Sequence, residues 1–186
     1  LQFKPGTDMA YSNWGYTLAG VLIAEVTNMP MDAFLHEQVL QPFGVHSTGT
    51  NPERIEAFNQ RVAPSRVMLG SLPLSGERWL GLPPQGPARG GASGNAFSTP
   101  AELSTWFRGV ARGEGLSPEL HQAMLTPRNK DKDYGLGLVI GGKEAPDMRW
   151  HNGALQPHGV STWVGYFPQT DLTIVVLQND YSVSAT

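Results

Sequence analysis

Three short groups of residues carry side chains suited to acyl-transfer chemistry. The first is Tyr11-Ser12-Asn13, which follows a Pro-Gly turn and precedes an apolar stretch of helical period. The second is His151-Asn152-Gly153-Ala154, at the end of a predicted strand, and the third is Tyr134-Gly135-Leu136-Gly137, which opens the strand before it. Each group alone arises often by chance, so the prediction depends on the three groups occurring together.

Acyl transfer through a serine needs a base near the hydroxyl and hydrogen-bond donors for the oxyanion. A tyrosine can act as the base when neighbouring cations lower its pKa. A glycine on an edge strand lets the backbone of a substrate approach and pair with that strand. A polar residue shortly before such a glycine can contact the carboxylate or the reacting centre of the substrate.

Each candidate also has a structural interpretation. Tyr11 could be a boundary aromatic with a hydrogen-bonded hydroxyl, Asn13 a helix cap, and His151 a half-exposed strand residue. Ser93 lacks the second glycine of a nucleophile elbow, which makes it a loop residue. His151 and His158 are too irregularly spaced, without more carboxylates, to indicate zinc. We therefore expect no metal and no cofactor.

The first predicted helix spans residues 14–26, where apolar side chains recur at helical spacing. We interpret Trp14, Trp106 and Trp163 as core residues. A second helical stretch follows between residues 30 and 42 and ends in a Pro-Phe-Gly sequence.

A clear helix start follows at Thr99-Pro100-Ala101-Glu102. Its threonine can cap the helix, its proline suits the first helical position, and its glutamate can close a capping box. A shorter helix is predicted to begin at Ser117 and to end before Pro127. Residues 51–95 show no sustained period, so we interpret them as loops with one short helix near residues 52–58.

From Tyr134 the apolar period changes to two, which is typical of strands. Strands are predicted at residues 134–141, 148–154, 159–167 and 172–178. The last of them is almost wholly apolar, which predicts burial on both faces and a partner that this chain does not supply. Helices followed by a roughly four-stranded antiparallel sheet define an α+β class. We expect residues 1–186 to form a single partial domain, with residues 1–130 mainly helix and loop and residues 131–180 antiparallel strands.

Composition excludes several classes of partner. The net charge is −3 and no basic run is present, so nucleic acid is not an expected partner. No apolar run approaches the roughly 20 residues that span a bilayer. There are no cysteines, hence no disulfide and no thiolate metal site. Because the chain begins at Leu1 without a leader-like segment, we interpret it as the interior of a longer reading frame, and its compartment stays open.

Five stretches follow one another in an ordered series. They are the segment around Pro5-Gly6 and Tyr11-Ser12-Asn13, then Pro42-Phe43-Gly44-Val45, Arg89-Gly90-Gly91, Tyr134-Gly135-Leu136-Gly137 and Trp150-His151-Asn152-Gly153-Ala154. In this order they resemble the serine β-lactamase and penicillin-binding-protein superfamily over nearly the whole chain. The resemblance implies an incomplete β-lactamase/transpeptidase-like fold and suggests the cell envelope or export.

The resemblance also implies roles for the candidate residues. Tyr11 would be the partner base of the nucleophile and Asn13 the contact to the substrate amide. His151 would occupy the place of the lysine in the family's Lys-Thr-Gly motif. Gly153 would give the strand clearance, and the N–H of Ala154 would be one oxyanion donor. We also expect Tyr11 and His151 to lie in one cleft.

The chain departs from the family pattern in two places. No serine has a lysine three residues further on, so the Ser-x-x-Lys nucleophile would lie upstream of Leu1. Asn152, a further substrate contact, replaces the more usual Thr or Ser, whereas histidine in the lysine position is compatible with peptidases and esterases.

The implied function is part of a serine hydrolase that acylates and deacylates on an amide or ester, namely a D-alanyl peptide, a β-lactam or an ester, and that is inactive as this fragment. The alternative is a non-catalytic binding module or truncated gene product that keeps the substrate cleft. The expected partners are a small-molecule or peptide substrate and either a second copy of the chain or an upstream segment of the parent protein.

Overall fold

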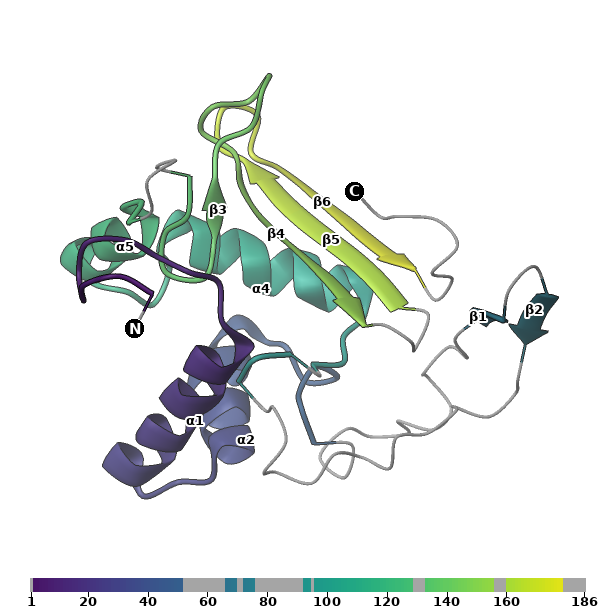
Figure 1. Ribbon diagram of the computed structural model, residues 1–186, viewed down its shortest axis with the longest axis horizontal. Coiled ribbons are helices and arrows are strands. Elements are labelled where there is room, and N and C mark those ends of the chain that lie inside the picture. The colour runs from purple at the N-terminus through teal and green to yellow at the C-terminus, as the bar shows by residue number, and fades with distance from the viewer. Residues whose placement is uncertain are drawn as a thin grey trace.

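The computed structural model describes residues 2–51, 66–69, 72–75, 92–94, 96–128, 133–155 and 160–178. The first part of the chain is helical and the last part is an antiparallel sheet, which confirms the predicted α+β class (Figure 1). One long helix lies across a face of the sheet, and the first two helices lie together beside one end of that layer (Figure 1).

Helix α1 (Asn13–Thr27) begins at Ser12, whose side chain accepts a hydrogen bond from the N–H of Gly15 at 3.1 Å. It ends at Asn28 in the left-handed conformation. Helix α2 (Met31–Phe34) continues into a π-helical segment (Leu35–Leu40) and a 3-10 turn (Gln41–Phe43). The predicted helix positions are therefore confirmed, with Ser12 as the first cap.

The apolar stripe of α1 is exposed, which makes the prediction of a buried Trp14 wrong. The Trp14 side chain is 83% exposed, and the other members of the stripe are exposed too: Leu18, Val21, Leu22 and Val26. The helix is buried instead at Gly20, where an added Cβ would lie 2.7 Å from the Ala92 Cβ. Helical spacing identifies an apolar face but does not say which element covers it.

Helix α4 (Pro100–Arg112) begins at Thr99, whose hydroxyl accepts a hydrogen bond from the N–H of Glu102 at 3.2 Å. The predicted capping box is only half formed. The Glu102 carboxylate accepts instead from the Ser47 N–H at 2.9 Å and the Thr48 hydroxyl at 2.7 Å. Glu102 thus ties α4 to the chain that follows the first helical pair. A shorter helix, α5 (Pro118–Leu125), begins at Ser117 as predicted.

The sheet has the strand order β3-β4-β5-β6, all antiparallel. Its strands are β3 (Val139–Ile140), β4 (Arg149–Leu155), β5 (Val160–Phe167) and β6 (Leu172–Gln178). The first is shorter than predicted. Before it only an isolated bridge joins Tyr134 to Val139, and Gly137 between them has a positive φ of 82° that interrupts extended backbone.

A second, two-stranded sheet lies in the region that we interpreted as loop. Strand β1 (Arg66–Leu69) pairs antiparallel with β2 (Leu72–Ser75). The sequence contains little indication of this two-stranded sheet, because a proline interrupts its second strand. The short helix expected near residues 52–58 lies outside the described residues.

The core lies between α4 and the sheet. Its buried members come from both layers: Phe107, Ala111, Leu138, Val164 and Tyr166. Val175 of β6 packs against this cluster, but Leu172 and Ile174 are exposed. β6 is the end strand of the described sheet, so this chain does not bury it on both faces, and the partner expected from the sequence stays a prediction.

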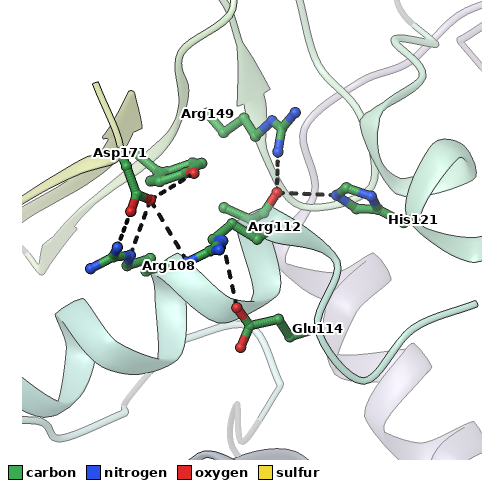
Figure 2. A network of polar contacts seen from close by, with 8 residues as sticks. Arg108, Arg112, Glu114, His121, Arg149 and Asp171 are labelled. Atoms are coloured by element: carbon green, nitrogen blue, oxygen red, sulfur yellow. Dashed lines mark hydrogen bonds and ion pairs between the residues drawn. The ribbon is translucent and has the colours of Figure 1, made fainter. Parts of the chain in front are cut away.

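A polar network fastens α4 to the sheet (Figure 2). Arg108 pairs with Asp171 in the β5–β6 turn, and the Tyr166 hydroxyl donates to the same carboxylate at 3.1 Å. Desolvation opposes ionisation of Asp171, but the hydrogen bonds from Arg108 and Tyr166 outweigh it and hold its pKa below the ordinary value. On the other side of the network, Arg149 of β4 and His121 of α5 both bind the Ala111 carbonyl at the end of α4.

The longest of the described helices is α1, with 15 residues. None of them alone combines enough length with enough apolar character to cross a bilayer. The segments Asn13–Thr27 and Met31–Phe43 reach that threshold only when they are joined, and they are bent by 85° at the break.

Candidate active site

Tyr11 and His151 lie beside each other although 140 positions (151 − 11) separate them. Their ring centroids are 6.3 Å apart. Tyr11 immediately precedes the cap of α1 and is 58% exposed, whereas His151 is the third residue of β4 and is half-buried. The fold therefore brings together the two side chains that the sequence analysis paired, one from a helix start and one from a strand.

Tyr134 joins these two rings, and the sequence analysis gave it no side-chain role. Its hydroxyl is 2.9 Å from His151 Nε2, and its ring meets the Tyr11 ring edge-on with centroids 6.1 Å apart. Tyr16 of α1 also lies close enough to Tyr134 to shift its pKa. The available signal was its place at the start of the strand that precedes the histidine strand, because neighbouring antiparallel strands bring such positions together.

Tyr134 and Tyr16 are both held in the protonated form. Burial raises the pKa of Tyr134, and the nearby Tyr16 and Tyr11 raise it further. Burial also raises the pKa of Tyr16, and the hydrogen bond with Tyr134 only partly offsets this. The two hydroxyls are therefore hydrogen-bond donors at neutral pH.

Among the described residues, the outer edge of β4 is open beside this cluster. Strand β3 is in register with only Arg149 and Trp150, so no described strand pairs with β4 beyond that point on this side. The Gly141 N–H donates to the Met148 carbonyl at 2.7 Å, which shows that the backbone of residue 148 faces β3. Since backbone directions alternate along a strand, the N–H groups of Asn152 and Ala154 face the same open side.

Alternation also separates the side chains of residues 151–154. His151 and Gly153 lie on the face of Arg149, which reaches α4, whereas Asn152 and Ala154 lie on the opposite face. The structure therefore does not bring the Asn152 side chain next to His151. It is the backbone N–H groups of Asn152 and Ala154 that face the open edge of β4.

Gly153 has a local reason to be glycine. It is in register with Thr162 of β5, and an added Cβ would lie 2.8 Å from the Thr162 Oγ1. The clearance expected of this residue is thus already required by the neighbouring strand. A larger residue would displace Thr162 before it met a substrate.

Asn13 is the first residue of α1 and is exposed. Its interpretation as the cap is wrong, because the Ser12 hydroxyl fills that role. Ser93, which the sequence analysis assigned to a loop, lies against α1, with its hydroxyl 3.2 Å from that of Thr17. His158 lies outside the described residues. In the part of the chain that the structure describes, no three side chains of His, Cys, Asp or Glu lie together as metal ligands would.

Comparison with known proteins identifies the class. The family model described as Beta-lactamase matches residues 1–184, so the chain belongs to the beta-lactamase family, within the serine β-lactamase and penicillin-binding-protein superfamily. A protein of Escherichia coli (strain K12) described as "Putative D-alanyl-D-alanine carboxypeptidase" is 25% identical over 203 residues, which cover 96% of this chain and 46% of that protein. A protein of the same description from Salmonella paratyphi B is 24% identical and is covered to 47%.

Solved structures share the fold at low identity. D-amino acid amidase from Ochrobactrum anthropi SV3, complexed with L-phenylalanine amide, matches with a TM-score of 0.75 and 22% identity over 96% of this chain and 52% of that one. A D-stereospecific amidohydrolase from Streptomyces sp. matches with a TM-score of 0.75 and 23% identity, over 96% and 53%. The chain thus spans about half the length of the relatives it matches.

Proposed function

We propose that this chain is the part of a serine hydrolase that supplies Tyr11, Asn13 and His151 to an acyl-transfer site. The observation that carries the proposal is the juxtaposition of Tyr11 and His151, with ring centroids 6.3 Å apart, beside the open edge of β4. As the phenolate, Tyr11 beside the imidazole can take a proton from a serine hydroxyl, and as the resulting phenol it can return that proton to the leaving group.

The open edge suits the other half of that chemistry. The outward N–H of Ala154 can donate to an oxyanion, and the open backbone from residue 151 to residue 155 can pair with an extended substrate. Asn13, exposed at the first turn of α1, can contact the substrate amide. The nucleophile comes from a Ser-x-x-Lys segment outside these 186 residues, since no serine of this chain has a lysine three residues further on.

The substrate class is an amide or ester of a small acyl group. The relatives described as D-alanyl-D-alanine carboxypeptidases and the D-amino acid amidase support an amide with a D-configured residue. The acylation and deacylation steps need no metal from the chain, because the serine, its base and the oxyanion donors suffice for covalent acyl transfer.

The test is the hydrolysis of D-phenylalanine amide and of an aryl ester by the full-length protein. Tyr11→Phe should lower kcat/KM by about 10²–10⁴, the usual contribution of a general base. The matched control, Tyr166→Phe, removes a hydroxyl in the network behind the sheet and should keep the wild-type kcat/KM. Full activity of Tyr11→Phe on both substrates would overturn the assignment.

A non-catalytic binding module is the second candidate, and the missing Ser-x-x-Lys favours it. Experiments on the full-length protein distinguish the two candidate functions. Substrate binding without turnover would support the module, whereas turnover that depends on Tyr11 would exclude it.

A further inference from the structure

Both ring nitrogens of His151 are held by the protein. Nδ1 is 2.6 Å from the carbonyl oxygen of Asn152, and Nε2 is 2.9 Å from the Tyr134 hydroxyl. A carbonyl oxygen only accepts hydrogen bonds, so Nδ1 must carry the ring hydrogen. In the neutral ring Nε2 is then a bare acceptor, and the Tyr134 hydroxyl is the donor.

We propose that Tyr134 is a positioning residue that holds the plane of the His151 ring and, together with the Asn152 carbonyl, its tautomer. The proposal rests on the proposed function for the use to which His151 is put, but the hydrogen-bond geometry is independent of it. Tyr134 acts on the reaction through His151 and has no assigned contact with substrate.

The backbone around Tyr134 makes it a rigid support. Its carbonyl accepts from the Arg128 N–H at 2.9 Å, and the next residue, Gly135, donates to the Leu138 carbonyl at 2.8 Å. An added Cβ on Gly135 would lie 2.2 Å from the Met124 carbonyl oxygen, which shows how closely this turn packs against α5. The backbone of Tyr134 is therefore firmly held, and a hydroxyl on such a support can hold the ring that it contacts.

Tyr134 also connects the histidine to α1. The Tyr16 side chain of α1 lies close enough to Tyr134 for each to shift the pKa of the other. Because Tyr11 packs edge-on against Tyr134 and faces the His151 ring, one residue sets the relative placement of both candidate catalytic rings. Neighbours that orient a ligating histidine have a comparable role at metal sites.

The test is nitrogen NMR of the histidine rings in the full-length protein at alkaline pH, where the rings are neutral. The His151 signal is identified by its loss in His151→Gln. We expect the wild-type ring to carry its hydrogen on Nδ1. In Tyr134→Phe, which removes only the hydroxyl, the signal should shift towards a mixture with the Nε2–H tautomer. In Tyr16→Phe the shift should be smaller, and in Tyr166→Phe it should be absent.

Steady-state kinetics of the same variant provide a second test. Tyr134→Phe should lower kcat about tenfold to a hundredfold while KM changes little, because misplacing a catalytic group weakens the chemical step more than substrate binding. A wild-type ring that carries its hydrogen on Nε2 would overturn the proposal even if Tyr134→Phe did not fold. So would a Tyr134→Phe variant with unchanged tautomer and kcat. If the tautomer responds but the wild-type protein hydrolyses neither substrate, the positioning role stands and the proposed function fails.

Discussion

The two regions that contribute to the candidate site are packed very differently. His151 stands on a sheet backed by α4, where Phe107 is 3% exposed and ion pairs fasten the layers. Tyr11 precedes α1, whose apolar stripe is exposed, with Trp14 at 83%. The histidine side of the site is therefore built on a closed core, whereas the tyrosine side is held by a few local contacts.

Those contacts show where the site is most sensitive. The contacts that tie helix α1 to other parts of the described chain include the Thr17–Ser93 hydroxyl pair and the packing of Gly20 against Ala92 and Met31. The first is a single hydrogen bond between side chains, worth about 0.5–1.5 kcal/mol net. The placement of Tyr11 relative to His151 thus depends on weak links, while the placement of His151 on the sheet does not.

The largest expected effect lies in the closed region. Phe107→Ala should lower the free energy of unfolding by about 3–5 kcal/mol, because it opens a cavity between α4 and the sheet. Chemical denaturation with a fluorescence or circular-dichroism readout measures this. The control is Leu120→Ala on α5, where the side chain is 60% exposed, and it should change the same quantity by less than about 0.5 kcal/mol. Equal effects of the two variants would mean that the core is wrongly placed.

The second effect concerns the link between the two regions. Burial opposes ionisation of Glu102, but hydrogen bonds from Thr48, Ser47 and His46 outweigh it and keep the carboxyl pKa below its ordinary value of 4.5. Such a group stabilises the fold above its unfolded-state pKa, and the stabilisation is lost as the pH falls through the lower folded-state pKa. Glu102→Gln should therefore lower the free energy of unfolding at neutral pH by about 1–3 kcal/mol. The free energy of unfolding of this variant should also decrease less steeply than that of the wild type as the pH falls.

The matched control for that experiment is Glu114→Gln. Glu114 forms one exposed ion pair, 3.6 Å from the Arg112 Nε, of a kind worth at most about 1 kcal/mol. The free energy of unfolding of the Glu114→Gln variant should decrease in acid as steeply as that of the wild type. A Glu102→Gln profile that is equally steep would show that the carboxylate does not make the contacts described.

Local signals in the sequence predicted the elements well. The helix starts at Thr99 and Ser117 were correct because capping depends on neighbouring residues alone. Strands predicted at residues 148–154, 159–167 and 172–178 differ by at most one residue at each end from β4, β5 and β6. The alternation of residues 160–167 and the continuous apolar run of residues 172–177 are both strong strand signals.

The site could be predicted only in part. The pairing of Tyr11 with His151 followed from the order of motifs, and their ring contact agrees with it. The part played by Tyr134 depends on an isolated bridge and on side-chain direction, which periodicity does not encode. The exposure of Trp14 was missed because an apolar face says nothing about what covers it.

The smallest effect on unfolding is expected on the α1 stripe. Trp14→Ser should change the free energy of unfolding of this chain by less than about 0.5 kcal/mol, because the side chain is already exposed. Its effect on association should be larger. Exposed apolar stripes drive self-association, so light scattering should find the 186-residue chain larger than its 20.1 kDa monomer, and Trp14→Ser should reduce that size. A monodisperse monomer that binds no hydrophobic dye would contradict this expectation.

The central claim is that this chain forms an acyl-transfer site around a serine it does not contain. Intact-mass spectrometry after incubation with a fluorophosphonate, and separately with penicillin, tests it on two proteins in parallel. The full-length protein should gain one fluorophosphonate adduct, on a serine outside these 186 residues, and the adduct should form more slowly in Tyr11→Phe. The 186-residue chain should gain none with either reagent. A stoichiometric adduct on a serine of the 186-residue chain, or no adduct on the full-length protein, would contradict the account.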